Sequence, residues 1–373
     1  MNFKPTYTNK NNKNIETQLN NNIIINKNIY NQINDIKSKI DDIEQYKWRL
    51  IRCIQTEYEF VGNNKFHNIK QLKERYCISR AYYKLWEILC HYENDFKLFQ
   101  NKKPMRLAGL AEAPGGFIQC LVDYRNNKKD NLTGISLKDS KDNKIDWVME
   151  HKNVKLIYGD EKKGHDGNLY NPEIIDYYCN YYKNKKADFV TADGGFLLEH
   201  NQENHKGQYH NHLFLAEIYI AMRILKKGGN FVIKIYDICN RTMIDLLTIL
   251  NRVFRKVNVM KPVTSREMNN ENYIVCIDYT YSKEITNNIK SIIDHMWKND
   301  NLIINNILKV KNDNLINLFS KISKRKMLHQ QRKLTNAISL KDKTREELIQ
   351  NIKDIHKIKS KKAYTWLEKN YLN

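Results

Sequence analysis

The chain has 373 residues, enough for one full α/β domain and about a hundred further residues. Its formal net charge of +21 opposes compaction and favours a polyanionic partner, of which RNA or DNA is the usual one. Every apolar run falls short of the roughly 18 residues that span a bilayer, and no signal peptide opens the chain, so a soluble, intracellular protein is expected.

The first 28 residues are dominated by Asn, Lys and Ile. Asn-rich, low-complexity segments do not build a core, so residues 1–28 are predicted to be disordered and 29–64 to form a helical extension. Heavy use of Asn, Lys, Ile and Tyr is typical of an AT-rich genome, such as that of a large DNA virus or an AT-rich microbe. A cytoplasmic location, or a viral factory or virion for a viral protein, is expected, with the nucleus left open.

Seven cysteines are scattered along the chain, and none forms a C-x-x-C pair. This spacing indicates neither a disulfide framework nor a zinc site. Reduced, mostly buried thiols are expected at Cys53, Cys77, Cys90, Cys120, Cys179, Cys239 and Cys276.

From residue 106 to 281, short apolar runs alternate with amphipathic stretches, which predicts a doubly wound, mostly parallel sheet. Helical spacing is clearest at 207–227 and 242–254. Only a loop containing Pro262 separates the last two runs, so they should form an antiparallel edge hairpin. The strand-like runs are 106–111, 132–136, 154–158, 187–192, 230–236, 256–261 and 273–281.

Residues 283–373 are predicted to form a basic helical region. They contain twenty Lys and Arg against nine Asp and Glu, a net +11. This excess is interpreted as an RNA-binding surface, the alternative being a merely well-solvated helical face.

The segment from Leu110 to Phe117, L-A-E-A-P-G-G-F, lies between the first strand of the sheet and a helix. A ligand can meet the exposed N–H groups of the helix there, and the adjacent glycines permit a close approach. Gly159-Asp160 follows the third strand at the same edge of the sheet, where its carboxylate could bind an adenine amino group. Each segment alone is also compatible with an ordinary turn.

Together with S-R-A-Y-Y-K-L at 79–85, V-T-A-D-G-G-F at 190–196, K-P-V-T-S-R at 261–266 and N-E-N-Y-I-V-C at 270–276, these segments resemble the FtsJ/RrmJ family of RNA 2′-O-methyltransferases. The narrower match is to the Adrift-type cap methyltransferases. The similarity covers about residues 68–282, and a methyltransferase domain over 65–282 is predicted. It implies a Rossmann-like α/β fold with a seven-stranded sheet, and S-adenosylmethionine as cofactor.

The resemblance assigns cofactor binding to residues at three strand ends. An acidic residue usually binds the cofactor ribose at the end of the second strand, but this chain has T-G-I-S there, and Gly109 replaces an acid in the first strand. Ser136 or backbone groups are therefore expected to bind the ribose, and Glu112 is expected to compensate in part. The cofactor residues are Glu112, Ala113, Pro114, Gly115, Gly116, Phe117, Ser136, Asp160 and Asp193.

The family's catalytic Lys-Asp-Lys-Glu tetrad matches Lys84, Asp193, Lys234 and Glu271. Glu267 is the other candidate for the glutamate, but only Glu271 precedes the x-Tyr-Ile-Val register. A ribose 2′-OH needs a base, and a Lys amine can serve once burial and a second ammonium lower its pKa. Lys234 is the predicted base, with Lys84 supplying the second charge.

Arg80, Tyr82, Ser265 and Arg266 are predicted to contact RNA. A histidine-rich segment also invites a metal interpretation, but no carboxylate or Cys spacing completes a site, so no metal is expected and a solvated loop is predicted instead. Its histidines are His200, His205, His210 and His212.

The predicted function is ribose 2′-O-methylation of one of the first transcribed nucleotides of capped mRNA. Methylation of ribosomal or transfer RNA is the alternative with the same chemistry. A catalytically inactive RNA-binding or stimulatory subunit is the alternative of another class. Capped RNA is the expected partner, with other capping or transcription proteins as further candidates.

Overall fold

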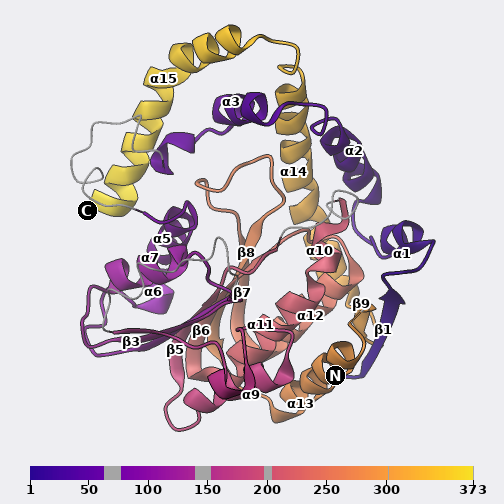
Figure 1. Cartoon of the computed structure of the whole chain (residues 1–373), viewed down its shortest axis with the longest axis vertical. Helices are drawn as coiled ribbons and strands as arrows, with labels where there is room; N and C mark the ends of the chain where they lie inside the picture. The colour runs from indigo at the N-terminus through magenta and orange to yellow at the C-terminus, as the bar shows by residue number, and fades with distance from the viewer. Residues whose placement is uncertain (63–76, 139–152, 197–203, 301, 373) are drawn as a thin grey trace.

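The computed structural model describes residues 1–62, 77–138, 153–196, 204–300 and 302–372. Seven strands form a central sheet, and neighbouring strands are parallel except around β8, which is antiparallel to both of its neighbours. The expected mostly parallel sheet with an antiparallel edge hairpin is confirmed (Figure 1). The strand order is β4 (Val154–Leu156), β3 (Asn131–Ile135), β2 (Arg106–Leu110), β5 (Ala187–Ala192), β6 (Leu225–Ile235), β8 (Asn272–Tyr279) and β7 (Phe254–Met260).

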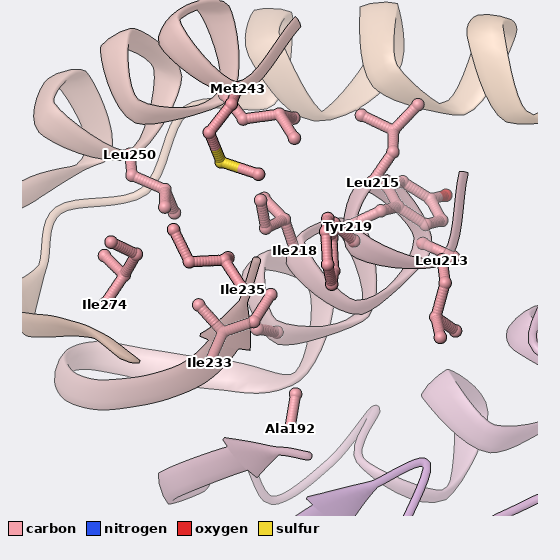
Figure 2. Close-up of a cluster of buried hydrophobic side chains, with 14 of the residues drawn as sticks. Ala192, Leu213, Leu215, Ile218, Tyr219, Ile233, Ile235, Met243, Leu250 and Ile274 are labelled. Atoms are coloured by element: carbon pink, nitrogen blue, oxygen red, sulfur yellow. The ribbon is translucent and has the colours of Figure 1, made fainter. Parts of the chain in front are cut away.

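Helices cover both faces of this sheet, which explains why its parallel strands are almost continuously apolar. One face packs against α5 (Ala81–His91) and α7 (Gly116–Arg125). The other packs against α9 (Pro172–Tyr181), α11 (Asn211–Ile224) and α12 (Arg241–Val253). Figure 2 shows this second layer, where Ile218 and Met243 of the helices lie near Ile233 and Ile235 of β6.

The helix expected at 207–227 is divided and shorter in the structure. A four-residue helix, α10 (Lys206–Tyr209), precedes α11, and β6 begins directly after α11 at Leu225. Gly228, the residue after the expected end of this helix, lies inside β6 with a φ of 79°. The helix expected at 242–254 matches α12, whose N-cap Asn240 accepts a hydrogen bond from the Met243 N–H.

The structure contradicts the prediction of disorder for residues 1–28. β1 (Phe3–Asn9) pairs with β9 (Leu302–Leu308) in a second, two-stranded sheet, and α1 (Ile15–Asn21) follows it. Three aliphatic side chains within the Asn-rich sequence are buried: Leu19, Ile23 and Ile25 are each at most 4% exposed. The cause is pairing across about 300 residues of chain, which local composition does not reveal.

The N- and C-terminal additions pack on each other to form an arch of helices above the sheet (Figure 1). In the arch, α2 (Lys27–Ser38) contacts α14 (Asp313–Ile338), and α3 (Gln45–Gln55) contacts α15 (Arg345–Leu367). α15 begins with a Thr344–Glu347 capping box. The region beyond residue 282 also includes β9, so it is not purely helical as expected. The domain boundaries stay predictions.

The remaining elements are η1 (Glu59–Gly62), α6 (Glu93–Phe96), η2 (Glu161–Lys163), α13 (Lys283–Lys298) and the π-helix η4 (Glu368–Leu372). The seven cysteines, which all lie among the described residues, form no disulfide bond. Within the described ranges, no helix is both long and apolar enough to cross a membrane.

Candidate active site

The loop from Ala111 to Gly115 links β2 to the N-terminus of α7. Ala111 and Gly115 both have positive φ, 52° and 105°, which glycine adopts at no steric cost. Gly116 is required by packing, because a Cβ there would lie 2.2 Å from the Ser79 Oγ. Phe117 is fully buried against Tyr273, so only its backbone can face a ligand. Gly115 is therefore favoured by its backbone conformation, whereas Gly116 is favoured by the lack of space for a side chain.

Glu112 turns back over the strand that precedes it. A Cβ at Gly109 would lie 2.6 Å from the Glu112 Cγ, so the glycine makes room for this side chain. One carboxyl oxygen accepts a hydrogen bond from Thr191, and the other is buried without a partner among the described residues. Burial, with the nearby charge of Asp193, raises the pKa of Glu112 well above its usual value. The Glu112 side chain thus occupies the space that a side chain at position 109 would fill.

Ser136 and Asp160 follow β3 and β4 at the same edge of the sheet. The Ser136 Oγ accepts a hydrogen bond from the Ala113 N–H at 3.0 Å, which fixes the loop. Asp160 caps η2 by accepting from the Lys162 N–H at 3.0 Å. Both side chains thus have structural partners in addition to their predicted roles with the cofactor.

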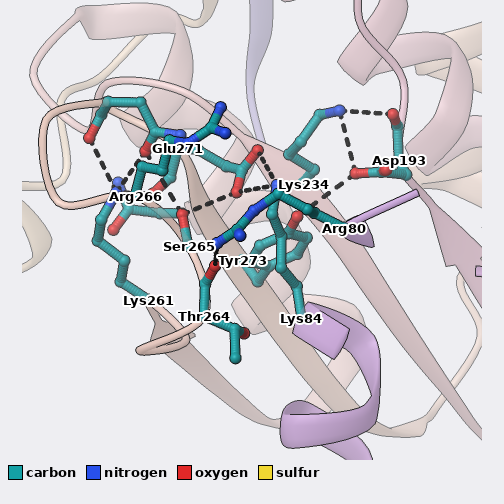
Figure 3. Close-up of polar contacts among 12 residues, drawn as sticks. Arg80, Lys84, Asp193, Lys234, Lys261, Thr264, Ser265, Arg266, Glu271 and Tyr273 are labelled. Atoms are coloured by element: carbon teal, nitrogen blue, oxygen red, sulfur yellow. Dashed lines mark hydrogen bonds and ion pairs between the residues drawn. The ribbon is translucent and has the colours of Figure 1, made fainter. Parts of the chain in front are cut away.

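The four predicted tetrad residues form two ion pairs (Figure 3). Lys84 of α5 reaches both carboxylate oxygens of Glu271, at 2.8 and 2.9 Å. Lys234 of β6 lies 3.0 Å from the Asp193 Oδ1 and donates to the Asp193 carbonyl at 2.6 Å. Their side chains are 9–17% exposed, so they lie at the floor of an accessible site.

Glu271 and Lys234 are both held in their charged forms. Burial raises the pKa of Glu271, but the ammonium groups of Lys84, Lys234 and Lys261 outweigh it and bring the value to about 2. Burial lowers the pKa of Lys234, but the charge of Asp193 more than compensates, and the net pKa lies above the usual value. The expectation of a lowered Lys234 pKa is therefore wrong for the free protein, because the charge of Asp193, 3.0 Å away, outweighs the effect of burial.

Glu267, the alternative glutamate, lies outside this group. Its Oε1 accepts from the Glu57 N–H at 3.3 Å and lies 3.4 Å from the Lys333 Nζ of α14. In the structure Glu271 therefore pairs with Lys84, whereas Glu267 pairs with Lys333 of the arch.

Lys261 supports Glu271, the predicted catalytic glutamate, and was missed by the sequence interpretation. Its Nζ donates to the Asn269 carbonyl, the Asn269 Oδ1 and the Glu271 carbonyl at 2.7–2.9 Å. These contacts close the loop between β7 and β8, which carries Glu271. Burial lowers the pKa of Lys261 to about 7. The K-P-V-T-S-R motif included this residue but did not indicate where its amine points.

Glu217 is a second unpredicted acid beside the site. It is fully buried on α11, and neither carboxyl oxygen has a hydrogen-bond partner among the described residues. A Cβ at Gly194 would lie 2.1 Å from its Oε1, so it packs under the backbone next to Asp193. Burial raises its pKa well above the usual value. The sequence interpretation gave this position no role.

Two of the four predicted RNA contacts point into the protein. Tyr82 is fully buried, donates to Asp123 at 3.0 Å and stacks on Trp86, so it cannot stack on a base. Ser265 is 1% exposed and donates to the Glu271 carboxylate at 2.9 Å. These two predictions are corrected: Tyr82 is a core residue, and Ser265 positions Glu271.

Arg80 and Arg266 remain partly exposed at the site. Both reach the Glu59 carboxylate of η1, at 3.5 and 2.8 Å. Arg80 also donates to the carbonyls of Glu59 and Thr264. Their roles toward RNA stay predictions.

The histidine segment is not the solvated loop that was expected. His210 is fully buried, stacks on Phe196 at 4.0 Å and accepts from the Phe196 N–H. Burial lowers the pKa of His210 to about 3 and that of His205 to about 4. His200 lies outside the described residues. No metal-binding group of three His, Cys, Asp or Glu occurs in the part of the chain that the structure describes.

The arrangement places two amines and two carboxylates beside a glycine-containing loop at a helix N-terminus. Such a site can orient a hydroxyl group and accept its proton without a metal ion. Loops of this kind, at the carboxyl edge of a doubly wound sheet, are where such folds bind their cofactors.

Comparison with known proteins agrees with this chemistry. The chain is 27% identical over 265 residues to the "Cap-specific mRNA (nucleoside-2'-O-)-methyltransferase 2" of Drosophila melanogaster, covering 66% of this chain and 36% of the relative. It is 31% identical over 175 residues to the mouse "Cap-specific mRNA (nucleoside-2'-O-)-methyltransferase 1", covering 45% of this chain and 21% of the relative. The chain thus spans about a third or less of these relatives.

Among solved structures, a Plasmodium falciparum protein described as a ribosomal RNA methyltransferase aligns with a TM-score of 0.40 at 23% identity, covering 56% of this chain and all of the other. The family model for FtsJ-like methyltransferases matches residues 77–279, which is more than half of the sequence. The chain therefore belongs to the FtsJ-like methyltransferase family, whose methyl donor is S-adenosylmethionine.

Proposed function

We propose that this protein transfers a methyl group from S-adenosylmethionine to a ribose 2′-OH near the 5′ end of capped mRNA. The observation that carries the proposal is the pair of lysine–carboxylate ion pairs beside the cofactor loop. The names of the relatives, which are cap-specific mRNA methyltransferases, support the choice of substrate.

The predicted cofactor residues fit the methyl donor. The loop from Glu112 to Phe117 offers backbone N–H groups at the start of α7, and one buried Glu112 oxygen lacks a partner among the described residues. Ser136 and Asp160 extend this surface along the sheet edge. When bound, S-adenosylmethionine supplies an electrophilic methyl group on a sulfonium ion.

Each tetrad residue has a role that follows from its contacts. Lys234 accepts the proton of the ribose 2′-OH once its own amine is neutral. Asp193 orients that amine through two contacts, at the carboxylate and the carbonyl. Glu271 fixes Lys84, whose positive charge can orient the nucleophilic oxygen. Ser265 and Lys261 hold Glu271 in place.

The test is a methyl-transfer assay with labelled S-adenosylmethionine and short RNAs that differ only at the 5′ end: capped, 5′-triphosphate, and capped with the first ribose already methylated. Nuclease digestion then locates the label. We expect 2′-O-methylation that depends on the cap. Equal transfer to uncapped RNA would favour a ribosomal or transfer RNA substrate, and RNA binding without transfer would favour an inactive subunit.

Lys234→Ala provides the matched control for this assay. Activity should disappear while the cofactor Kd changes by no more than a few-fold, because the amine acts on the nucleophile. More than a tenth of the wild-type turnover in this variant would contradict Lys234 as the base.

A further inference from the structure

A cavity of about 640 Å³ opens beside the catalytic glutamate, between the active site and the arch of helices. Glu271, Arg266 and Tyr236 line it on the side of the site. On the side of the arch its wall includes Trp48 and Arg52 of α3. Those two residues lie outside the matched family domain, so the resemblance gave them no role. The volume is in the range of cavities that hold small ligands.

Trp48 and Arg52 are four residues apart on α3, and residues at this spacing share one face of a helix. Trp48 is half-buried. The Nε of Arg52 is buried and has no hydrogen-bond partner among the described residues. α3 thus presents a flat aromatic ring and an incompletely satisfied guanidinium group to the same cavity.

Positive charge is in excess at this wall. The guanidinium groups of Arg80 and Arg266 share one carboxylate, that of Glu59. Arg52 lies close enough that, after burial, the charge of Arg266 also lowers its pKa, and Glu59 only partly compensates. Arginine stays protonated despite such shifts. The lining has four cations (Lys37, Arg52, Lys206 and Arg266) against two carboxylates (Asp41 and Glu271). This excess favours a further anion, and arginine binds phosphate oxygens with good geometry.

We propose that this cavity is a subsite for one nucleotide of the substrate RNA, adjacent to the ribose that receives the methyl group. Arg52 and Arg266 bind its phosphate, and Trp48 stacks on its base. Proteins that bind single-stranded RNA use the same combination of basic groups and stacking aromatic rings. This inference rests on the proposed function and deepens it, since it assigns substrate binding to the N-terminal extension.

The test measures RNA affinity by fluorescence anisotropy with S-adenosylhomocysteine present, so no turnover is required. Arg52→Ala is compared with Arg49→Ala, which removes the same charge from the exposed surface of the same helix. We expect Arg52→Ala to weaken RNA binding at least tenfold and to reduce the salt slope by about 0.7. Arg49→Ala should stay within about threefold of wild type. Equal effects of the two variants would overturn the subsite.

Trp48 is tested by two variants. Trp48→Ala should weaken RNA binding about tenfold, and Trp48→Phe should restore most of the loss, because stacking needs a ring. Melting temperature and cofactor Kd serve as controls for folding. Full affinity in a folded Trp48→Ala protein, or equal losses in the two variants, would contradict stacking.

The phosphate can belong to the 5′ end or to an internal linkage. RNAs with a 5′-triphosphate or a 5′-hydroxyl distinguish these sources: a loss in Arg52→Ala confined to the triphosphate RNA places the contact at the 5′ end, and an equal loss places it internally. Failure of the two proposals is also distinguishable. RNA binding through Trp48 and Arg52 without methyl transfer would contradict only the proposed function. If the wild-type protein transfers the methyl group and Arg52→Ala binds RNA as tightly as wild type, only the subsite is contradicted.

Discussion

The proton on Lys234 sets the expected pH dependence of the reaction. Burial lowers its pKa, but the charge of Asp193 raises the pKa by more than burial lowers it, so the amine is protonated at neutral pH. A base must be neutral to accept a proton, and below the pKa its neutral fraction grows about tenfold per pH unit. We expect single-turnover methyl transfer to rise steadily from about pH 6 into the alkaline range, as measured with saturating cofactor and RNA.

Two variants test whether Lys234 is the group that sets this pH profile. Asp193→Asn removes the charge that raises the Lys234 pKa most, so the rise in rate should move to lower pH while the maximal rate falls. A rise centred near pH 7 that disappears in Lys261→Met would contradict the assignment, because the pKa of Lys261 is about 7.

Glu271 and Glu267 form a matched pair for the glutamate role. Glu271→Gln removes the charge that holds Lys84, so methyl transfer should fall by at least tenfold. Glu267→Gln alters a contact to Lys333 on α14 and should leave the rate within about threefold. The ratio of the two kcat values is the measurement, with melting temperatures as the control. The reverse ranking would show that Glu267 carries the role.

At the residue scale, the sequence predicted which residues form the site better than it predicted where their side chains point. The family's motifs identified Lys84, Asp193, Lys234 and Glu271, and in the structure these four residues form two neighbouring ion pairs. Tyr82 was misassigned because a motif does not reveal which face of its helix is buried. The histidines were misassigned for the opposite reason: a polar composition suggested solvent, but His210 is enclosed by aromatic rings.

The loop between β7 and β8 is the element that positions Glu271, and Lys261 closes it. In Lys261→Met three acceptor groups on Asn269 and Glu271 lose their donor, and buried acceptors without a donor are costly. We expect kcat to fall at least tenfold with little change in the KM for cofactor. Lys326→Met is the matched control, since this lysine lines the same side of the loop and bonds to Asn272.

An equal loss of kcat in the two lysine variants would indicate a general effect of charge. Recovery of activity in Lys261→Gln, which still donates hydrogen bonds, would support the positioning role. A lower melting temperature with unchanged kcat would contradict it.

The elements of the central sheet could be predicted because each is encoded locally. Apolar runs identified all seven strands of the sheet, whereas the helix expected at 207–227 is divided into α10 and α11 and ends at Ile224. β1 and β9 could not be found in this way. Their pairing is specified by contacts such as that of Thr8 with Asn305, almost 300 residues apart, and a local pattern does not reveal such contacts.

At the scale of the whole molecule, the C-terminal region is part of the fold as well as a source of charge. Asp245 of α12 accepts hydrogen bonds from the backbone N–H groups of Ile307 and Leu308, and Arg241 donates to the Leu308 carbonyl. Truncation before β9 would remove these partners. Each buried polar group left without one costs about 1–3 kcal/mol, so we expect such a truncation to melt far below the intact protein or fail to fold.

The contribution of this region to RNA binding must therefore be tested with point substitutions. Lys321, Lys324 and Arg325 are exposed on α14, and two of them line a groove beside Lys261. Every cation that neutralises a phosphate of single-stranded RNA adds about 0.7 to the slope of log affinity against log salt concentration. Replacing all three by Gln should weaken RNA binding and lower the slope by about 2 if each contacts a phosphate.

Lys353, Lys357 and Lys361 are exposed on α15 and provide a control with the same loss of charge. They do not line either of the cavities beside the active site. Their replacement by Gln should change affinity only through the general field, with the slope nearly intact. If the two triple variants lower the slope equally, the positive charge of the C-terminal helices attracts RNA without holding it at a defined place on α14. If only the α14 variant does so, the RNA leaves the active site along α14, and the arch forms part of the binding surface.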